Sequence, residues 1–427
     1  MTNALVKLWG TTIGYVSYDE ADPIQPALFE YDKNFISSGI PLSPIAMPLS
    51  TRVYSFPELN EATYHHLPGL LADSLPDKFG NQIFQSWLNA HGKQAMNPVE
   101  QLCYLGTRGM GALEYFPDTG SRDKWAGMLP IEIDSLRQVA SDILTQRASF
   151  KGNVSAMEQL IKIGTSAGGA RAKAIIAWNE ETGEVRSGQV KAEPGFSYWL
   201  LKFDGIRNNG DDNGPDSHQY TRIELAYYYM ATHCGIQMMP TRILENNGYY
   251  HFLTQRFDRD QKTGDKRHMQ SLCGLAHIDF NTPGICSYEY VAQIAHKIGC
   301  PQADIEELFR RMVFNVFARN QDDHTKNISF LMDRQGKWSL SPAYDICYAN
   351  KPGNQWLDKH QMSINGKRSG FLIEDFLICA EKMSIRSTKA KKIIAEIQKG
   401  VRQWKTFAEM ANLDSNFSDE IWSNLYT

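Results

Sequence analysis

The stretch NQDDHTKN, residues 320–327, decides the fold, and it lies between two clear secondary-structure patterns. Residues 303–317 before it carry apolar side chains at helical spacing. Residues 328–332 and 338–340 after it read as two strands of a hairpin, joined by a turn that contains Gly336. The polar side chains of the stretch are therefore predicted to lie on a loop that core elements support at both ends. The hairpin is followed at once by SPAYD, which ends in Asp345.

Asp322 and Asn327 stand at the spacing D-x-x-x-x-N, which is that of the protein-kinase catalytic loop. In that loop the aspartate handles the hydroxyl proton and the asparagine binds magnesium. Asp345 stands where a kinase places its main magnesium ligand, and Mg²⁺ needs few protein oxygens because nucleotide phosphates supply others. The spacing alone is a weak signal, because it arises by chance on the order of once in a chain of this size.

Two features earlier in the chain fit the same chemistry. Residues 163–173, IGTSAGGARAK, contain Gly164, Gly168 and Gly169, which let backbone N–H groups approach an anion closely. The segment is not a Walker A loop, because no G-K-[ST] follows the glycines. Lys202 lies in an otherwise apolar predicted strand, and Glu224 on the next helix is the nearest carboxylate to hold it. A surface turn and a snorkelling lysine explain each feature alone, but their order along the chain favours a kinase.

Composition argues against several other classes. The 427 residues carry 44 Lys and Arg against 48 Asp and Glu, and the net charge of −4 argues against nucleic-acid binding through the overall field. Apolar runs fall far short of the ~20 residues that span a bilayer, and the start resembles no secretory signal, so a cytoplasmic protein without a membrane partner is expected. The 7 cysteines include no C-x-x-C pair, which indicates reduced thiols rather than disulfides or a zinc site.

The pattern along the chain predicts an α+β protein with a β-rich part followed by a mainly helical part. The expected domains are 1–120, an N-terminal module; 121–257, a β-rich lobe with the glycine-rich loop; and 258–427, a helical lobe with the catalytic loop. A hairpin is expected over residues 4–18, and strands over 174–178, 188–190, 198–203, 242–244 and 249–254. Helices are expected over 67–92, with an interruption at Pro76, and over 131–148, 218–234 and 288–298.

Together these residues resemble the HipA serine/threonine kinases, the toxins of bacterial HipBA toxin–antitoxin pairs, over nearly the whole chain. The marks of the resemblance are GTSAGGARAKA (164–174), TQRFDR (254–259), the loop that ends in Lys326 and Asn327, and SPAYD (341–345). GLLADSLPD (69–77) is similar to the N-terminal module of that family. The resemblance implies a two-lobed protein-kinase-like fold, in which the extra HipA-type module at residues 1–120 docks a partner.

The resemblance also implies a role for each matching position. Asp322 would be the catalytic aspartate, Asn327 and Asp345 the magnesium ligands, and Ser166 the autophosphorylated serine. Lys202 would hold the phosphates of ATP. The other implied ATP contacts are Gly168, Gly169, Ala170, Arg171, Ala172 and Lys173 in the glycine-rich loop, Gln255, Arg256 and Phe257 in the hinge against adenine, and His324, Thr325, Lys326 and Tyr344 with the catalytic loop and its hairpin.

By the same resemblance, the protein transfers the γ-phosphate of ATP, with Mg²⁺, to a Ser or Thr of an aminoacyl-tRNA synthetase and so stalls translation. Its expected partners are a HipB-like helix-turn-helix antitoxin and, through that complex, operator DNA. Two alternatives stay open: a catalytically weak, antitoxin-bound transcriptional corepressor, and a small-molecule kinase. The retained Lys202, Asp322, Asn327 and Asp345 argue against the first, and the long N-terminal module argues against the second.

Two places depart from the family pattern. Gly169 and Arg171 make the glycine-rich loop differ from that of the best-known member, which alters nucleotide grip or substrate reach. Asp323 stands where glycine is common and puts a second negative charge beside Asp322. That charge is expected either to raise the pKa of Asp322 or to point away into solvent.

Overall fold

The computed structural model describes residues 1–22, 24–76, 78–90, 92, 94–120, 130–144, 160, 163, 171–206 and 219–426. The chain forms two compact units. Unit 1 comprises residues 1–42, 47–221 and 240–269, and unit 2 comprises residues 43–46, 222–239 and 270–427. Within the described ranges, no helix is both long and apolar enough to cross a bilayer. All seven cysteines are free thiols, as the sequence predicts.

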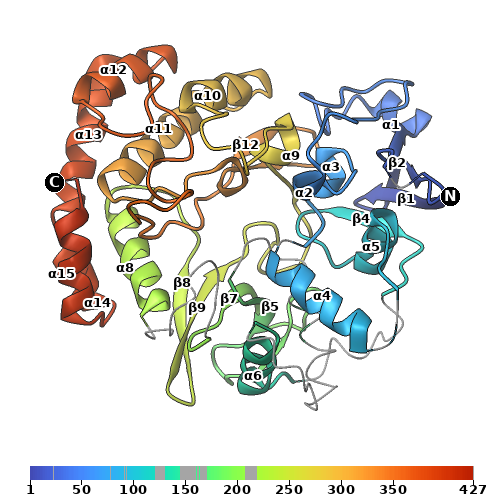
Figure 1. Cartoon of the computed structure of the whole chain (residues 1–427), viewed down its shortest axis with the longest axis horizontal. Helices are drawn as coiled ribbons and strands as arrows, with labels where there is room; N and C mark the ends of the chain where they lie inside the picture. Colours follow the sequence, from blue (N-terminus) through green and yellow to red (C-terminus); the bar gives the residue numbers. More distant parts are fainter. Residues whose placement is uncertain are drawn as a thin grey trace. The chain divides into compact units, whose positions relative to one another are not determined.

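The first sheet of unit 1 has the strand order β3-β2-β1-β4 (Figure 1). Its strands are β1 (Thr2–Leu8), β2 (Thr11–Tyr18), β3 (Leu28–Tyr31) and β4 (Leu113–Phe116), and the predicted N-terminal hairpin is confirmed as β1 and β2. Alternate residues of β1 are buried, among them Val6 and Leu8, because side chains alternate between the faces of a strand. Helix α5 (Pro98–Leu105) begins with a capping box between Asn97 and Glu100.

The helices around the first sheet are short, apart from one. They are α1 (Lys33–Ser38), α2 (Glu61–Tyr64), α3 (Gly69–Ala72) and the longer α4 (Lys78–Ala90). The helical stretch expected over residues 67–92 is two helices, α3 and α4, and the interruption predicted at Pro76 lies between them.

The second sheet of unit 1 has the order β6-β5-β7-β9-β8. Its strands are β5 (Lys173–Trp178), β6 (Val185–Ser187), β7 (Ser197–Lys202), β8 (Thr241–Asn246) and β9 (Tyr249–Gln255). Its apolar face shares one core with α4 and α6 (Ile133–Leu144), as Figure 1 shows by their proximity. This core includes Phe79 and Ile83 of α4, Leu136 of α6, Ile176 of β5 and Leu253 of β9.

The strand expected over residues 188–190 is wrong, because β6 ends at Ser187. The N–H of Gly188 donates to the carbonyl of Ile175 at 3.1 Å. A Cβ at residue 188 would lie 2.3 Å from the Ile176 carbonyl oxygen, so the chain passes β5 too closely for any side chain. The sequence pattern therefore predicted the strand at residues 188–190, whereas the strand observed, β6, lies just before Gly188.

Unit 2 is mainly helical and contains α8 (Tyr220–His233), whose first two residues belong to unit 1. Its other helices are α9 (Leu272–Ala276), α10 (Tyr288–Lys297), α11 (Gln302–Phe317), α12 (Ile373–Lys382), α13 (Ser387–Val401), α14 (Trp404–Met410) and α15 (Ser415–Asn424). A small sheet has the order β10-β11-β12, with β10 (His268–Ser271), β11 (Ser329–Met332) and β12 (Trp338–Leu340). Helix α11 contacts both α10 and α13, and from Leu308 to Phe317 only one of its residues, Arg310, is not buried.

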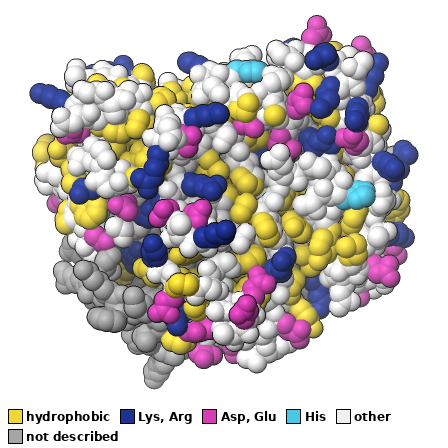
Figure 2. All heavy atoms as spheres, turned by 180° about the vertical axis from the view of Figure 1, so that it is seen from behind, with side chains coloured by type: hydrophobic (Ala, Val, Ile, Leu, Met, Phe, Trp, Pro, Cys, Tyr) yellow, Lys and Arg dark blue, Asp and Glu magenta, His cyan; other side chains and the backbone are white. Residues whose placement is uncertain are grey.

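Surface charge agrees with the small net charge of the sequence. Figure 2 shows Lys and Arg side chains interspersed with Asp and Glu side chains over the visible face, with apolar side chains between them. On this face, a charged ligand would therefore be recognised by local groups rather than by a field of one sign.

The close approach at Gly188 generates a test of packing. We expect Gly188→Ala to lower the free energy of unfolding by about 1–3 kcal/mol, because the added methyl group must displace the backbone of β5. Ser187→Ala, one residue earlier on β6, adds no atom and is the matched control, with an expected loss below ~1 kcal/mol. Urea unfolding followed by circular dichroism measures both, and equal losses in the two variants would contradict the assigned contact.

Candidate active site

The loop at residues 320–327 begins where α11 is closed by its own hydrogen bonds. The N–H of Ala318 donates to Phe314 O at 2.7 Å, and Arg319 has a φ of +54°, which turns the chain away from the helix axis. Asn320 then anchors the turn to the helix: its N–H donates to Asn315 O at 2.9 Å, and its Nδ2 donates to Asn315 Oδ1 at 3.0 Å. The predicted helix, loop and hairpin are therefore present in that order.

Asp323 is buried inside unit 2, with a side chain only 1% exposed. Its Oδ2 accepts a hydrogen bond from Tyr288 Oη at 2.8 Å and lies 3.0 Å from His360 Nδ1. Its Oδ1 accepts from the N–H of Gln361 at 2.7 Å. Asp323 therefore neither points into solvent nor lies open beside Asp322, because its carboxylate is committed to partners in the interior.

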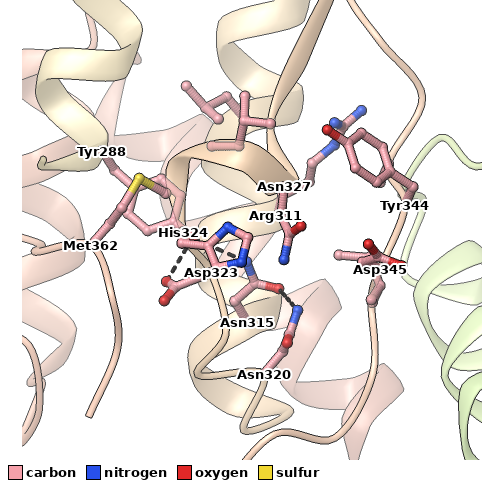
Figure 3. A pocket seen from close by; sticks show the side chains of 14 residues that line it. Tyr288, Arg311, Asn315, Asn320, Asp323, His324, Asn327, Tyr344, Asp345 and Met362 are labelled. Carbon is pink, nitrogen blue, oxygen red and sulfur yellow. Dashed lines mark hydrogen bonds between the residues drawn. The ribbon is translucent and has the colours of Figure 1, made fainter. Parts of the chain in front are cut away.

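Tyr288 extends this buried network toward α11. Its hydroxyl accepts a hydrogen bond from Asn315 Nδ2 at 3.0 Å while it donates to Asp323. Burial, and next the neighbouring carboxylate of Asp323, raise the pKa of Tyr288 well above its usual value, so the phenol keeps the proton that it donates. Figure 3 shows Tyr288, Asp323, Asn315 and Asn320 around one pocket.

The neighbouring Asp322 is the more accessible aspartate, with a side chain 46% exposed. His324 Nε2 lies 3.7 Å from its Oδ1. Asn327, at the end of a short 3₁₀ helix (Thr325–Asn327), donates from Nδ2 to the carbonyl of Asp322 at 2.8 Å. This bond fixes the orientation of the Asn327 amide and commits its nitrogen, so its oxygen is the atom that can ligate a cation.

Thr325, Lys326 and Tyr344 fix the remainder of the loop. Thr325 Oγ1 donates to Ile278 O at 2.8 Å, and Tyr344 Oη donates to Lys326 O at 2.7 Å. Tyr344 Oη also lies 2.5 Å from Ser329 Oγ on β11. The side chains of Thr325 and Tyr344 thus hold the loop in place. The side chain of Lys326 has a different contact: its Nζ lies 5.2 Å from the centre of the Phe280 ring.

Asp345 is positioned by the segment that follows β12. The N–H of Ala343 donates to Gln237 O at 2.8 Å, and Arg311 Nη2 donates to Ser341 O at 2.8 Å. Arg311 is itself held by Glu307, through an Nε–Oε1 contact of 2.9 Å. Asp345 has a φ of +52°, a left-handed conformation that is costly outside glycine and that clusters at functional sites.

One pocket in unit 2 is lined by most of these residues (Figure 3). Among them, Asn327 supplies an amide oxygen and Asp345 a carboxylate, which are the hard oxygen ligands that Mg²⁺ prefers. The donor set therefore fits a magnesium ion that completes its coordination with water and phosphate oxygens. His324, Tyr344 and the buried Asp323 line the same pocket.

The predicted phosphate lysine Lys202 has a cross-strand partner that the sequence did not reveal. In the register of β5 and β7, Lys173 stands directly opposite Lys202, which places both side chains on one face of the sheet. Lys173 is 2% and Lys202 8% exposed. The strand registers, which the sequence does not give, are what bring the two lysines together.

The hinge residues separate into two kinds. Gln255 and Phe257 are half-buried and can meet a ligand, whereas Arg256 is buried. Arg256 donates through Nε and Nη2 to Asp258 at 2.8 and 2.7 Å and through Nη1 to Gly188 O at 2.9 Å. Its guanidinium therefore serves the interior of unit 1, and the place of Arg256 in the hinge against adenine stays a prediction.

Some predicted residues cannot be placed in the site. Ser166, Gly168, Gly169 and Ala170 lie outside the described residues. Arg171 stacks its guanidinium over the Tyr220 ring, 3.9 Å from its centre, and Ala172 is buried in the core of the second sheet. Glu224 is buried on α8 in unit 2, and Lys202 lies in unit 1, so their pairing stays a prediction.

Comparison with known proteins supplies the family. Residues 4–116 match the family model HipA N-terminal domain, and residues 165–404 match the HipA-like C-terminal domain. The chain belongs to the HipA family. Its fold is similar to that of a solved chain from the Shewanella oneidensis complex of HipA, HipB and operator DNA, with a TM-score of 0.70, 17% identity, and coverage of 99% of this chain and 94% of the other. The α+β, kinase-like fold class is thereby confirmed.

Two curated relatives of this HipA family protein match over shorter stretches. The Haemophilus influenzae protein named "Putative kinase" is 25% identical over 180 residues, and "Putative kinase Y4mE" of Sinorhizobium fredii is 23% identical over 134 residues. The matches cover 36% and 30% of this chain. The chain spans about half of the first relative, 51%, and about a third of the second, 32%.

The different burial of the two adjacent aspartates gives a prediction. Asp323→Ala should lower the free energy of unfolding by about 3 kcal/mol or more, because it leaves buried donors of Tyr288 and Gln361 without an acceptor. Asp322→Ala is the matched control and should cost less than ~1 kcal/mol, since that side chain is half exposed. Thermal and urea unfolding measure the stability of both variants. A larger loss of unfolding free energy in Asp322→Ala than in Asp323→Ala would contradict the assignment of Asp323 as the buried, hydrogen-bonded aspartate.

Proposed function

We propose that this HipA family protein is an ATP-dependent protein serine/threonine kinase. The observation that carries the proposal is the arrangement of Asp322, Asn327 and Asp345: Asn327 is held by the Asp322 carbonyl, and Asn327 and Asp345 line one pocket. This is the acceptor, amide and carboxylate set that phosphoryl transfer requires. Membership of the HipA family and the names of the curated relatives support the same activity.

In the proposed reaction, the side chain of Asp322 accepts the proton of the attacking Ser or Thr hydroxyl. Its partial exposure leaves it accessible to a protein substrate, and the His324 ring lies beside it, with Nε2 3.7 Å from Asp322 Oδ1. Asn327 and Asp345 would hold Mg²⁺, which neutralises charge on the phosphates of ATP. Lys173 and Lys202 would hold phosphate oxygens from the face of the second sheet, and Lys326 would contribute from the loop.

The remaining roles of the protein are proposals of the same kind. Gln255 and Phe257 would contact adenine, and the glycine-rich loop at residues 168–173 would cover the phosphates. The protein substrate would be an aminoacyl-tRNA synthetase, with inhibition of translation as the outcome. A HipB-like antitoxin would bind the chain, and operator DNA would be reached through it. The solved Shewanella oneidensis complex contains HipA, HipB and operator DNA, which supports both partners. Residues 1–120, 121–257 and 258–427 would act as docking module, β-rich lobe and helical lobe.

The catalytic assignment predicts the effect of removing its two carboxylates. Asp322→Ala and Asp345→Ala should each reduce magnesium-dependent autophosphorylation or ATP hydrolysis by about 100-fold or more, because both act mainly on the transition state. Asp419→Ala is a control on the exposed surface of α15, where the side chain is 66% exposed and pairs with Lys405. Phosphate release and circular dichroism are measured together, and strong phosphotransfer by a folded Asp345→Ala protein would contradict the metal assignment.

Ser166 gives a second test, on regulation. A phosphoryl group at this position adds about −1.5 to −2 charges beside the loop that is proposed to cover the triphosphate, so it should weaken ATP binding. Ser166→Glu should therefore bind ATP more weakly than the parent, and Ser166→Ala should bind it equally. The measurements are phosphosite mapping by mass spectrometry after incubation with Mg-ATP, and ATP titration of both variants. An unmodified Ser166, together with unchanged binding by Ser166→Glu, would exclude the switch.

A further inference from the structure

The motif TQRFDR, residues 254–259, leads from β9 into the interior of unit 1 and alternates in burial. Gln255 and Phe257 are half-buried, whereas Arg256, Asp258 and Arg259 are buried. The alternation separates the residues that can contact a nucleotide from those that cannot. The three buried ionic residues need a different explanation, because burying charge is costly unless every group is paired.

Asp258 lies at the centre of this buried group and is 0% exposed. Its carboxylate receives two hydrogen bonds from Arg256 and one from Arg259 Nη1 at 2.8 Å. The N–H of Gly111 donates to its Oδ2, also at 2.8 Å. Burial alone would raise the pKa of Asp258, but Arg256 and Arg259 outweigh it and hold the pKa well below its usual range. The carboxylate therefore stays ionised.

Arg259 carries the network to the segment that precedes β4. Its Nη1 donates to Gly111 O and its Nη2 to Gly109 O, both at 3.0 Å. Gly111 is thus held from both sides, by Asp258 at its N–H and by Arg259 at its carbonyl. Its φ is +70°, and a Cβ would lie 3.1 Å from Met269 N, so glycine is required at this contact. Burial, and next Arg256, lower the pKa of Arg259 to about 10, which leaves it charged at neutral pH.

Arg256 carries the same network into the second sheet. Its Nη1 donates to Gly188 O, just after β6, and its backbone N–H donates to Tyr198 O on β7 at 2.9 Å. The N–H of Gln255 donates to Pro240 O at 2.9 Å. One continuous set of buried bonds therefore joins residues 109–111 of the matched N-terminal domain to the main chain of residues 255–257.

We propose that Asp258 and Arg259 are positioning residues. Through their hydrogen bonds, the position of residues 109–111 determines the position of the segment 255–257, which is proposed to contact the nucleotide. This inference rests on the proposed kinase function and adds to it a mechanical role for the N-terminal domain. A buried ionic network of this kind is either fully paired or broken, because partial separation leaves charges without partners. If residues 109–111 are displaced and the network stays paired, residues 255–257 move with them. Nucleotide affinity then depends on residues that never touch the nucleotide.

Lys266 provides a matched control on the same two parts of the chain. Its Nζ donates to Thr107 O at 2.6 Å and to Glu114 Oε1 at 2.8 Å, and Trp9 Nε1 donates to its carbonyl at 2.9 Å. It therefore also ties the N-terminal domain to the segment after β9. The hydrogen bonds of its side chain go to Thr107 and Glu114 and not to the motif at residues 254–259, while its main chain lies opposite Arg259 in an isolated antiparallel bridge. Lys266→Met therefore removes side-chain bonds outside the motif and keeps this bridge.

The experiment compares Arg259→Met with Lys266→Met in the full chain. Arg259→Met cuts the link to Gly109 and keeps Asp258 paired with Arg256. We expect it to raise the KM for Mg-ATP about tenfold, with kcat within about threefold of the parent, because the nucleotide site is misplaced and the catalytic loop is intact. Lys266→Met should leave the KM within about twofold. A purely structural role would instead lower the amount of active protein and leave the KM unchanged.

Amide hydrogen exchange of residues 254–258 without nucleotide is the second readout. Exchange at Arg256 should be faster in Arg259→Met and unchanged in Lys266→Met. Arg259→Lys, which keeps the positive charge but lacks the planar guanidinium that bonds Gly109, Gly111 and Asp258 at the same time, replaces Arg259→Met if that variant does not fold. Unchanged KM and exchange in the Arg259 variant, or equal changes in the Lys266 variant, would overturn the positioning role. A parent protein that binds no ATP would overturn the kinase proposal, while the exchange comparison would still measure the coupling.

Discussion

The loop at residues 320–327 of unit 2 depends on hydrogen bonds to a buried carboxylate, that of Asp323. Asp323 accepts hydrogen bonds from the hydroxyl of Tyr288 on α10 and from the N–H of Gln361, and its Oδ2 lies 3.0 Å from His360 Nδ1. An ionised carboxylate in the interior costs several kcal/mol unless donors surround it, so these partners cannot separate from the loop without a penalty. Because the side chain of Asp323 is fixed in the interior, the side chain of the preceding residue, Asp322, faces outward. Adjacent aspartates thus acquire opposite environments, and the outward one is available for chemistry.

Unit 1 satisfies a buried carboxylate in a different way. Asp258 is compensated by the guanidinium groups of Arg256 and Arg259, whereas Asp323 is surrounded by a phenol, an imidazole and a backbone amide. Charge compensation extends in several directions, because each guanidinium has five donors and reaches carbonyls on other segments. The network around Asp258 therefore spans distant parts of unit 1, whereas the network around Asp323 joins the loop at residues 320–327 to α10 and to residues 360 and 361 within unit 2.

Local patterns predicted the elements that carry the site but not its partners. Helix α11, the loop at residues 320–327, the hairpin and Asp345 follow from apolar periodicity and turn residues, which are properties of neighbouring residues. The burial of Asp323 could not be predicted, because Tyr288 and His360 lie 35 and 37 residues away in sequence. Strand pairing could not be predicted either, because it also depends on residues far apart in sequence. It places Lys173 opposite Lys202, and β6 ends before Gly188. The inward turn of Arg256 likewise requires Gly188 and Asp258 to be in place.

The shared core of α4 and the second sheet has a consequence for biosynthesis. Phe79 and Ile83 on α4 join a core that Leu253 on β9 completes, and 170 residues separate Ile83 from Leu253 (253 − 83). At roughly 5–20 residues per second, the ribosome needs on the order of 10–30 s to supply the missing strand. During that interval the apolar face of α4 emerges without its final partners. The nascent chain therefore passes through an aggregation-prone stage in which chaperones have time to act, and its yield in the cell depends on translation speed as well as on final stability.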